Sequence, residues 1–350
     1  MKAGASQNSG ADLRAAVILA AALVLLFALR LVRIPVSPAV AALSLIVFMI
    51  LVSLYVLSGV PGLRRRLRGL LREQPRRLWL LPAGLWTLSL IYGGLTGQFD
   101  LYLVAGGLIY CAVPCLLIER LRSAEPQLGI LDLVVIIYLW FPVEFGWVPD
   151  LSVPPLGGMI NYYHIAALIL LITLYLVVRN LPDVGFTYRL RGPDIRTAIH
   201  STLLFLPLAL ILGFPTGFIA LNPRPPGLAE MAAALLAVYF FTGLPEELLF
   251  RGVIHNLIER RLLRAGRSRT TALIVSSIVF GLSHGNNNDA PFLEIPLGPL
   301  GVWRAPWVYM ILATLAGFFY GWTYIKTRRV TAAALVHALV DWLWGMFFHA

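Results

Sequence analysis

The sequence predicts an all-α, polytopic integral membrane protein with about eleven transmembrane helices, because many apolar runs approach the roughly 20 residues that a helix needs to cross a bilayer. Its composition points the same way: 59% of the 350 residues are hydrophobic, only 13% are charged, and the mean hydropathy is +0.80. Soluble domains carry about 25% charged residues. The short alternating segments typical of a membrane β-barrel are not seen, so helices are the expected spanning elements.

The expected spans fall into an N-terminal and a C-terminal group. The first segment lacks a small-residue cleavage site, so it is interpreted as a retained span rather than a signal peptide. Residues 1–125, with about four spans, contain almost no ionisable residue inside a span and form an expected accessory region. In chain order, the expected spans are residues 14–30, 37–59, 78–96, 101–118, 131–148, 163–178, 199–220, 229–257, 270–284, 307–325 and 330–348.

The net charge of +11 is distributed as in a membrane protein rather than a nucleic-acid-binding protein. Arginines cluster between spans, as in the stretch PGLRRRLRGLLREQPRR at residues 61–77, which we expect to contact anionic lipid headgroups. Alternate loops collect most of the 28 basic residues if the N-terminus is cytoplasmic. This positive-inside pattern predicts a multi-pass protein of the cell (inner or plasma) membrane, with the C-terminus outside and no nucleic-acid partner.

The stretch TGLPEELLFRG, residues 242–252, places three ionisable side chains inside an apolar segment. Such residues are costly at membrane depth, which makes them functional candidates by default. Glu247 and Arg251 have the i,i+4 spacing of a helical ion pair, so Glu246 must project from a different side of the helix. Desolvation makes a carboxylate such as Glu246 a better proton acceptor, as a general base requires. Pro245 removes a backbone hydrogen bond and is expected to kink the span.

Two further stretches carry ionisable residues on later spans. In VFGLSHG, His284 follows Phe280 by one helical turn, and in VHALVDW, His337 and Asp341 share one helix face. Counted from the nearest basic loops, Glu246 and His284 lie at similar depths of roughly 21–23 Å, and the other pair lies at roughly 12–18 Å. We therefore expect the three segments to converge on one water-filled cavity. The alternative is an ion-paired network that only orders the helices.

These residues form three motifs on successive apolar segments: Glu246-Glu247-x-x-x-Arg251, Phe280-x-x-x-His284 and His337-x-x-x-Asp341. In this order they resemble the motifs of the CAAX-protease and bacteriocin-processing (CPBP or ABI) family, the glutamic intramembrane endopeptidases also called type II CAAX prenyl proteases. The resemblance covers about residues 195–350. This range is the motif-bearing part of an expected protease core that spans residues 126–350. It implies hydrolysis of a peptide bond in a membrane-embedded or membrane-proximal peptide or protein, with no metal or other cofactor.

The resemblance also implies a role for each motif residue. Glu246, as general base, and His284 would activate a water molecule, while His337 and Asp341 would stabilise the oxyanion. Glu247 and Arg251 would orient the site. Many family members have asparagine at position 341, and an ionised carboxylate cannot donate a hydrogen bond as an amide does. Either Asp341 is protonated, or it orients His337 and supports its positive charge, or this member is catalytically weakened.

Other functions stay open on the sequence alone. The stretch GLSHG, residues 281–285, fits a G-x-S-x-G pattern, and Ser283 would then act as in a rhomboid-like protease, but that elbow requires a strand–turn–helix context. The zinc motif H-E-x-x-H is absent, although His284, His337 and Glu246 form a conceivable metal-binding set. Outside hydrolases, the buried carboxylates suit a proton- or ion-coupled transporter, or a non-catalytic scaffold or immunity-type protein.

Overall fold

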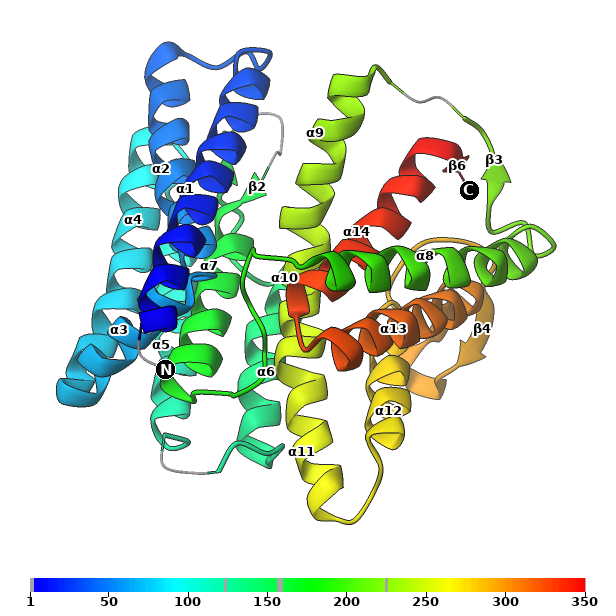
Figure 1. Ribbon diagram of the computed structural model, residues 1–350. Helices are drawn as coiled ribbons and strands as arrows, with labels where there is room; N and C mark the ends of the chain where they lie inside the picture. The colour runs from blue at the N-terminus through cyan, green and yellow to red at the C-terminus, as the bar shows by residue number, and fades with distance from the viewer. Residues whose placement is uncertain (1–2, 123–124, 156–159, 224–225, 350) are drawn as a thin grey trace. The chain divides into compact units, whose positions relative to one another are not determined.

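The computed structural model describes residues 3–122, 125–155, 160–223 and 226–349, and its regular structure is helical apart from three short two-stranded sheets (Figure 1). The chain divides into two compact units. Unit 1 comprises Met1–Pro182 with Thr187–Arg189, and unit 2 comprises Asp183–Phe186 with Leu190–Ala350. The predicted all-α membrane fold is confirmed. The assignment of residues 1–125 to an accessory role and of residues 126–350 to a protease core stays a prediction.

Within the described residues, eight helices are long and apolar enough to cross a membrane, so the expected count of eleven is not confirmed. The other three expected segments form shorter helices: Ile130–Glu144, Tyr162–Val178 and Arg269–Leu282. A helix of 14 residues, such as Arg269–Leu282, extends only about 21 Å, which is less than the hydrocarbon thickness of about 30 Å. The eight candidate spans are Gly10–Leu31, Pro38–Leu57, Pro75–Thr96, Leu101–Glu119, Gly192–Gly213, Leu228–Arg264, Trp307–Thr327 and Val330–Phe347.

Unit 1 is built around the short helix α7 with its π-helical extension η2, whose side chains are nearly all buried. Tyr162 donates a hydrogen bond to the Leu85 carbonyl at 2.7 Å, and the Tyr163 hydroxyl lies 3.0 Å from that of Ser89. These bonds satisfy phenol groups that would otherwise be buried without partners. The elements are α1 (Ala3–Leu31), α2 (Pro38–Leu57), α3 (Pro61–Glu73), η1 (Pro75–Trp79), α4 (Leu80–Thr96), α5 (Leu101–Glu119), α6 (Ile130–Glu144), β1 (Ser152–Val153), β2 (Ile160–Asn161), α7 (Tyr162–Leu171) and η2 (Ile172–Val178).

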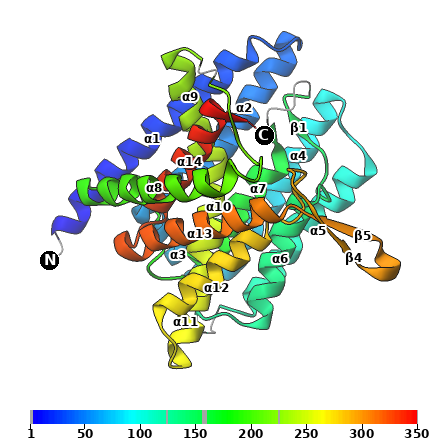
Figure 2. The ribbon, with the colours of Figure 1, turned by 90° about the vertical axis from the view of Figure 1, so that its right-hand side faces the viewer.

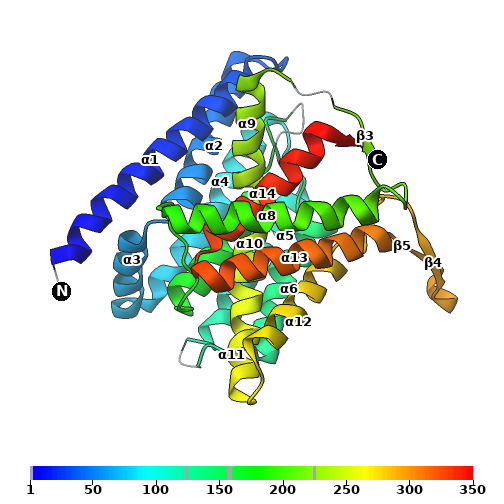
Figure 3. The ribbon, with the colours of Figure 1, turned by 45° about the vertical axis from the view of Figure 1, so that its right-hand side comes forward.

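Unit 2 contains every motif residue. One helical column runs without interruption from residue 228 to 264, and α8 and α13 lie side by side across it (Figures 1 and 3). A short β-hairpin, β4–β5, projects from the end of α12 (Figure 2). The elements are α8 (Gly192–Gly213), β3 (Ala220–Leu221), α9 (Leu228–Val238), η3 (Tyr239–Gly243), α10 (Leu244–Glu247), η4 (Leu248–His255), α11 (Asn256–Arg264), α12 (Arg269–Leu282), β4 (Leu293–Pro296), η5 (Gly298–Leu300), β5 (Val302–Ala305), α13 (Trp307–Thr327), α14 (Val330–Phe347) and β6 (Phe348–His349).

The column changes its helical pitch on both sides of the glutamate pair. The π-helical turns η3 and η4 flank α10, the four-residue α-helical piece that contains Pro245, Glu246 and Glu247. Proline has no N–H for the usual i→i−4 bond, and π-turns often mark functional sites in helices. The expected disturbance near Pro245 therefore takes the form of wider turns within a continuous helix.

Helices α12 and α13 pack closely because Gly281 has no side chain. A Cβ atom at this position would overlap the side chain of Thr314 and lie 2.6 Å from the Met310 carbonyl oxygen. Ser268 begins α12 by accepting a hydrogen bond from the backbone N–H of Thr271 at 3.1 Å, a standard N-cap. The start of α12 is thus set locally by Ser268, and the contact at Gly281 places the end of α12, which precedes His284, against α13.

Candidate active site

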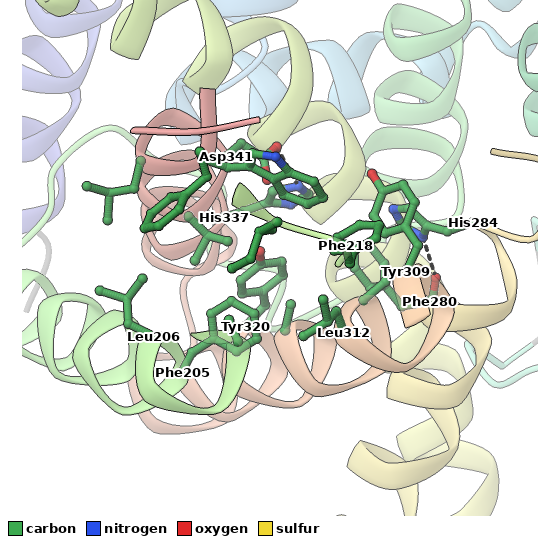
Figure 4. A pocket seen from close by; sticks show the side chains of 18 of the residues that line it. Phe205, Leu206, Phe218, Phe280, His284, Tyr309, Leu312, Tyr320, His337 and Asp341 are labelled. Atoms are coloured by element: carbon green, nitrogen blue, oxygen red, sulfur yellow. Dashed lines mark hydrogen bonds and ion pairs between the residues drawn. The ribbon is translucent and has the colours of Figure 1, made fainter. Parts of the chain in front are cut away.

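Unit 2 encloses a cavity with about 830 Å³ of empty space, part of it open to the surroundings. Its walls are largely apolar, with contributions from α8, α12, α13 and α14. Four of the six predicted site residues line it: Glu246, His284, His337 and Asp341 (Figure 4). The predicted convergence of the three motif segments on one cavity is therefore confirmed.

Glu247 and Arg251 form the predicted ion pair. Glu247 Oε2 lies 3.2 Å from Arg251 Nε, and both side chains are essentially inaccessible to solvent. Arg251 Nη2 also donates to the Gly317 carbonyl on α13 at 2.8 Å, and its guanidinium lies 4.5 Å from the centre of the Phe280 ring. The pair thus joins the column to α12 and α13, and neither member lines the cavity.

His337 lies close to three carboxylates and one aromatic ring. Its Nδ1 donates to Glu247 Oε1 at 3.1 Å, while its Nε2 lies 3.3 Å from Asp341 Oδ2 and 3.8 Å from Glu246 Oε2. Its ring stacks on Tyr320, with centroids 4.6 Å apart and planes inclined by 18°. The i,i+4 pairing of His337 with Asp341 is confirmed, and the hydrogen bond to Glu247 fixes which ring nitrogen faces the cavity.

The two adjacent glutamates have different surroundings, as helix geometry predicts. The side chain of Glu246 is 34% exposed and lines the cavity, whereas that of Glu247 is 0% exposed and faces Arg251 and His337. Glu246 is therefore the carboxylate that a ligand in the cavity can reach. Glu247 is a buried acceptor that joins Arg251 of its own motif to His337 on α14.

His284 lies in the turn after α12 and approaches the cavity from the side opposite His337 and Asp341 (Figure 4). Its Nδ1 donates to the Phe280 carbonyl at 2.8 Å, and its ring packs against Tyr309 at a centroid distance of 5.0 Å. Because a carbonyl can only accept, the proton is on Nδ1, and Nε2 of the neutral ring is an acceptor. The spacing Phe280-x-x-x-His284 sets the tautomer through this backbone bond.

The structure gives little support to a serine site at GLSHG. Ser283 follows an α-helix rather than a strand, and its hydroxyl donates to the Phe280 carbonyl at 2.6 Å. It is not part of the cavity lining. For a metal site, no group of three or more His, Cys, Asp or Glu side chains with suitable geometry occurs among the described residues.

Sequence reasoning missed the contribution of α13. Tyr309 and Tyr320 pack on the two motif histidines, and the Gly317 carbonyl accepts from Arg251. These positions recur at helical spacing on one face, together with Ala313 and Ala316, which also line the cavity. That periodicity of small and aromatic residues was the available signal, but it is equally typical of ordinary helix packing.

The fold and the cavity define a multi-pass membrane protein with a carboxylate and histidine site among its helices. Residues 228–343 match the family model of the Type II CAAX prenyl endopeptidase Rce1-like proteins. No curated protein and no solved structure matches the chain. Residues 228–343 are therefore similar to the Rce1-like domain of the CAAX protease family, and this stretch includes all six predicted site residues.

Proposed function

We propose that the protein is an intramembrane endopeptidase that hydrolyses a peptide bond with a water molecule activated by Glu246 and His284. The observation that carries this proposal is that both residues line one cavity with His337 and Asp341, although they come from different segments of the chain. The Rce1-like domain supports the same class of reaction.

In the proposed reaction, a water molecule lies between Glu246 and His284. Nε2 of His284 accepts one hydrogen bond from it and orients it, while the Glu246 carboxylate accepts the other proton as general base. The water oxygen forms a bond to the peptide carbonyl carbon and the carbonyl oxygen becomes an oxyanion. Glu246 then passes its proton to the amide nitrogen, the C–N bond breaks, and a carboxylic acid and an amine are released.

The oxyanion is stabilised by His337 in this scheme. Because Nδ1 of His337 already donates to Glu247, donation to the oxyanion uses Nε2–H, which requires an imidazolium ring. The carboxylates of Glu247 and Asp341, 3.1 and 3.3 Å from the ring nitrogens, provide the opposite charge. Asp341 thus acts as a support for His337, which does not require the amide found in many relatives of this family.

The walls of the cavity favour an apolar substrate segment. Phe205, Leu206 and Leu210 of α8 and Leu312 of α13 line it beside the polar residues. A membrane-embedded or membrane-proximal peptide can place apolar side chains there while its carbonyl meets Glu246. We propose such a peptide or protein as the substrate, in the cell membrane, with the N-terminus cytoplasmic and the C-terminus outside.

The test uses purified protein in nanodiscs and a diverse library of labelled apolar peptides. Wild type, Glu246→Gln and His284→Ala are compared with two matched controls, Glu230→Gln on α9 and His200→Ala on α8, which change exposed residues of the same type. We expect cleavage by wild type and both controls, with and without a chelator, and none by the two site variants.

Other outcomes separate the alternatives. Loss of cleavage on chelation would replace this mechanism with a metal-dependent one. If no form cleaves any peptide, ion flux through proteoliposomes becomes the deciding measurement. Flux that depends on Glu246 would indicate a transporter, and a biological function that survives Glu246→Gln would indicate a scaffold.

A further inference from the structure

A second cavity lies in unit 1, which contains none of the motif residues, and its polar wall is basic. It contains about 720 Å³ of empty space, part of it open, between α3, the chain after α5 and the end of η2. Arg68, Arg72, Arg122, Arg179 and Asn180 supply its polar side chains, and no Asp or Glu of the described residues lines it. The sequence alone indicated only a general contact of the basic stretch at residues 61–77 with lipid headgroups.

Arg68 is held in place by the backbone of η2. Its Nη2 donates to the Leu176 carbonyl at 2.8 Å, and its Nε donates to the Val177 carbonyl at 3.4 Å. A guanidinium has five N–H donors, so these bonds orient the group without exhausting it. Burial lowers the pKa of Arg68, and its like-charged neighbours Arg72 and Arg65 lower it further. An anion bound here would relieve this crowding of positive charge.

Arg122 reaches the cavity from the chain after α5. Its Nη1 and Nη2 donate to the carbonyls of Leu71 and Pro75 at 3.2 and 3.4 Å. Its Nε is buried and has no hydrogen-bond partner among the described residues. A buried donor without a partner is unfavourable and calls for an acceptor from outside the protein, such as a bound ligand.

Arg179 differs from the other three because it has its own counter-charge. Its Nη2 lies 3.3 Å from Asp132 Oδ2, with both side chains 1% exposed, and its Nη1 donates to the Leu121 carbonyl at 3.0 Å. The buried pair fixes the end of η2 and leaves the positive charges of Arg68, Arg72 and Arg122 as the net charge of the cavity.

We propose that this cavity binds the phosphate group of an anionic molecule. Planar guanidinium groups bind phosphate oxygens through paired, charge-assisted hydrogen bonds, and here they converge from separate segments of the chain. Helix α3 lies between two candidate spans, α2 and Pro75–Thr96, so the cavity is close to a membrane surface. A phospholipid headgroup and a free phosphate compound share this chemistry, and the experiment separates them.

The experiment uses full-length protein in nanodiscs of phosphatidylcholine alone or with phosphatidylglycerol. In the first type of disc, inorganic phosphate is titrated while the apparent Tm is followed, and native mass spectrometry counts retained phosphatidylglycerol from the second. The variants are Arg72→Gln, Arg122→Gln and the control Arg76→Gln, which removes an exposed arginine of the same basic stretch that does not line the cavity. Arg72 is exposed, so its replacement is not expected to disturb folding.

We expect Arg72→Gln and Arg122→Gln to weaken anion binding about tenfold or more, because each removes a charged hydrogen-bond donor. Arg76→Gln should bind as the wild type does. A response to phosphatidylglycerol alone identifies a lipid headgroup, and a saturable response to inorganic phosphate without lipid dependence identifies a free phosphate compound. Equal weakening by Arg72→Gln and Arg76→Gln, or no dependence on either anion, would overturn the proposal.

Discussion

Glu247 and His337 are joined by a hydrogen bond of 3.1 Å between Glu247 Oε1 and His337 Nδ1, although 90 positions separate them in the chain. The same carboxylate pairs with Arg251 through its other oxygen. The buried side chain of Glu247 therefore neutralises the charge of Arg251 and orients His337, the histidine that faces the cavity. The consequences of this arrangement can be measured.

Replacing the two glutamates should give different results. Glu247→Gln leaves Arg251 without a counter-charge in a buried site, so we expect unfolding to require about 3 kcal/mol less free energy. Glu246→Gln changes a partly exposed side chain and should alter stability by less than about 1 kcal/mol while abolishing cleavage. Denaturant unfolding in detergent, together with the peptide assay, checks both. Equal losses of stability would contradict the division of roles.

Asp341 should be replaceable by asparagine but not by alanine. The asparagine side chain keeps a polar group about 3 Å from His337 Nε2 and can itself donate to an oxyanion. We expect Asp341→Asn to retain cleavage and Asp341→Ala to lower kcat about 10²-fold. Steady-state kinetics on the preferred library peptide provides the measurement. An inactive Asp341→Asn would mean that the negative charge itself is essential.

Tyr320 should matter through its ring rather than its hydroxyl. The ring stacks on His337 and its side chain is 2% exposed, so Tyr320→Phe preserves the contact whereas Tyr320→Ala removes it. We expect the phenylalanine variant to cleave nearly as the wild type does, and the alanine variant to lose about 3 kcal/mol of stability and most of its activity. A large defect in Tyr320→Phe would instead assign a role to the hydroxyl.

Gly281→Ala should be destabilising because the added methyl group collides with α13. The ideal Cβ position overlaps Thr314 and comes within 2.6 Å of the Met310 carbonyl, so we expect a loss of about 1–3 kcal/mol. Gly94→Ala in α4 is the matched control, because nothing lies within 4 Å of the added atom. Thermal unfolding of both variants tests this, and a neutral Gly281→Ala would show that α12 can move away from α13.

The ion pair in unit 1 should be worth more than one at the surface. Asp132→Ala leaves Arg179 buried without its partner, and we expect a loss of about 3 kcal/mol or more. The bridge between Arg304 and Glu294 is 63% and 69% exposed, so Glu294→Ala should cost about 0–1 kcal/mol. Similar effects for the two variants in a denaturant titration would be inconsistent with the burial of the first pair.

Local spacing predicted the parts of the site that lie within one helix. Glu247 with Arg251 and His337 with Asp341 are i,i+4 pairs, and both pairs form in the structure. The different directions of Glu246 and Glu247 follow from the same geometry, because neighbouring residues on a helix cannot face one spot. These features required only a helical backbone.

The number of spans was less predictable, because an apolar run does not reveal where its helix begins and ends. The segments at residues 131–148, 163–178 and 270–284 form helices shorter than the candidate spans. Helix α7 illustrates the reason, since its apolar side chains are buried against other protein segments. A helix that is buried in protein and a helix that spans lipid are both rich in apolar residues. Hydropathy therefore does not distinguish them.

By itself the sequence determined the membrane class of this protein, the positions of its three motifs and the ion pairs within single helices, because composition and helical periodicity are local properties. Only the tertiary structure decided that Glu247 holds His337, that the tyrosines of α13 pack on both motif histidines, and that Arg68 and Arg122 share a basic cavity. These contacts join segments far apart in the chain. They depend on which helix faces meet, and that choice is made by packing over the whole unit rather than by the residues at any one position.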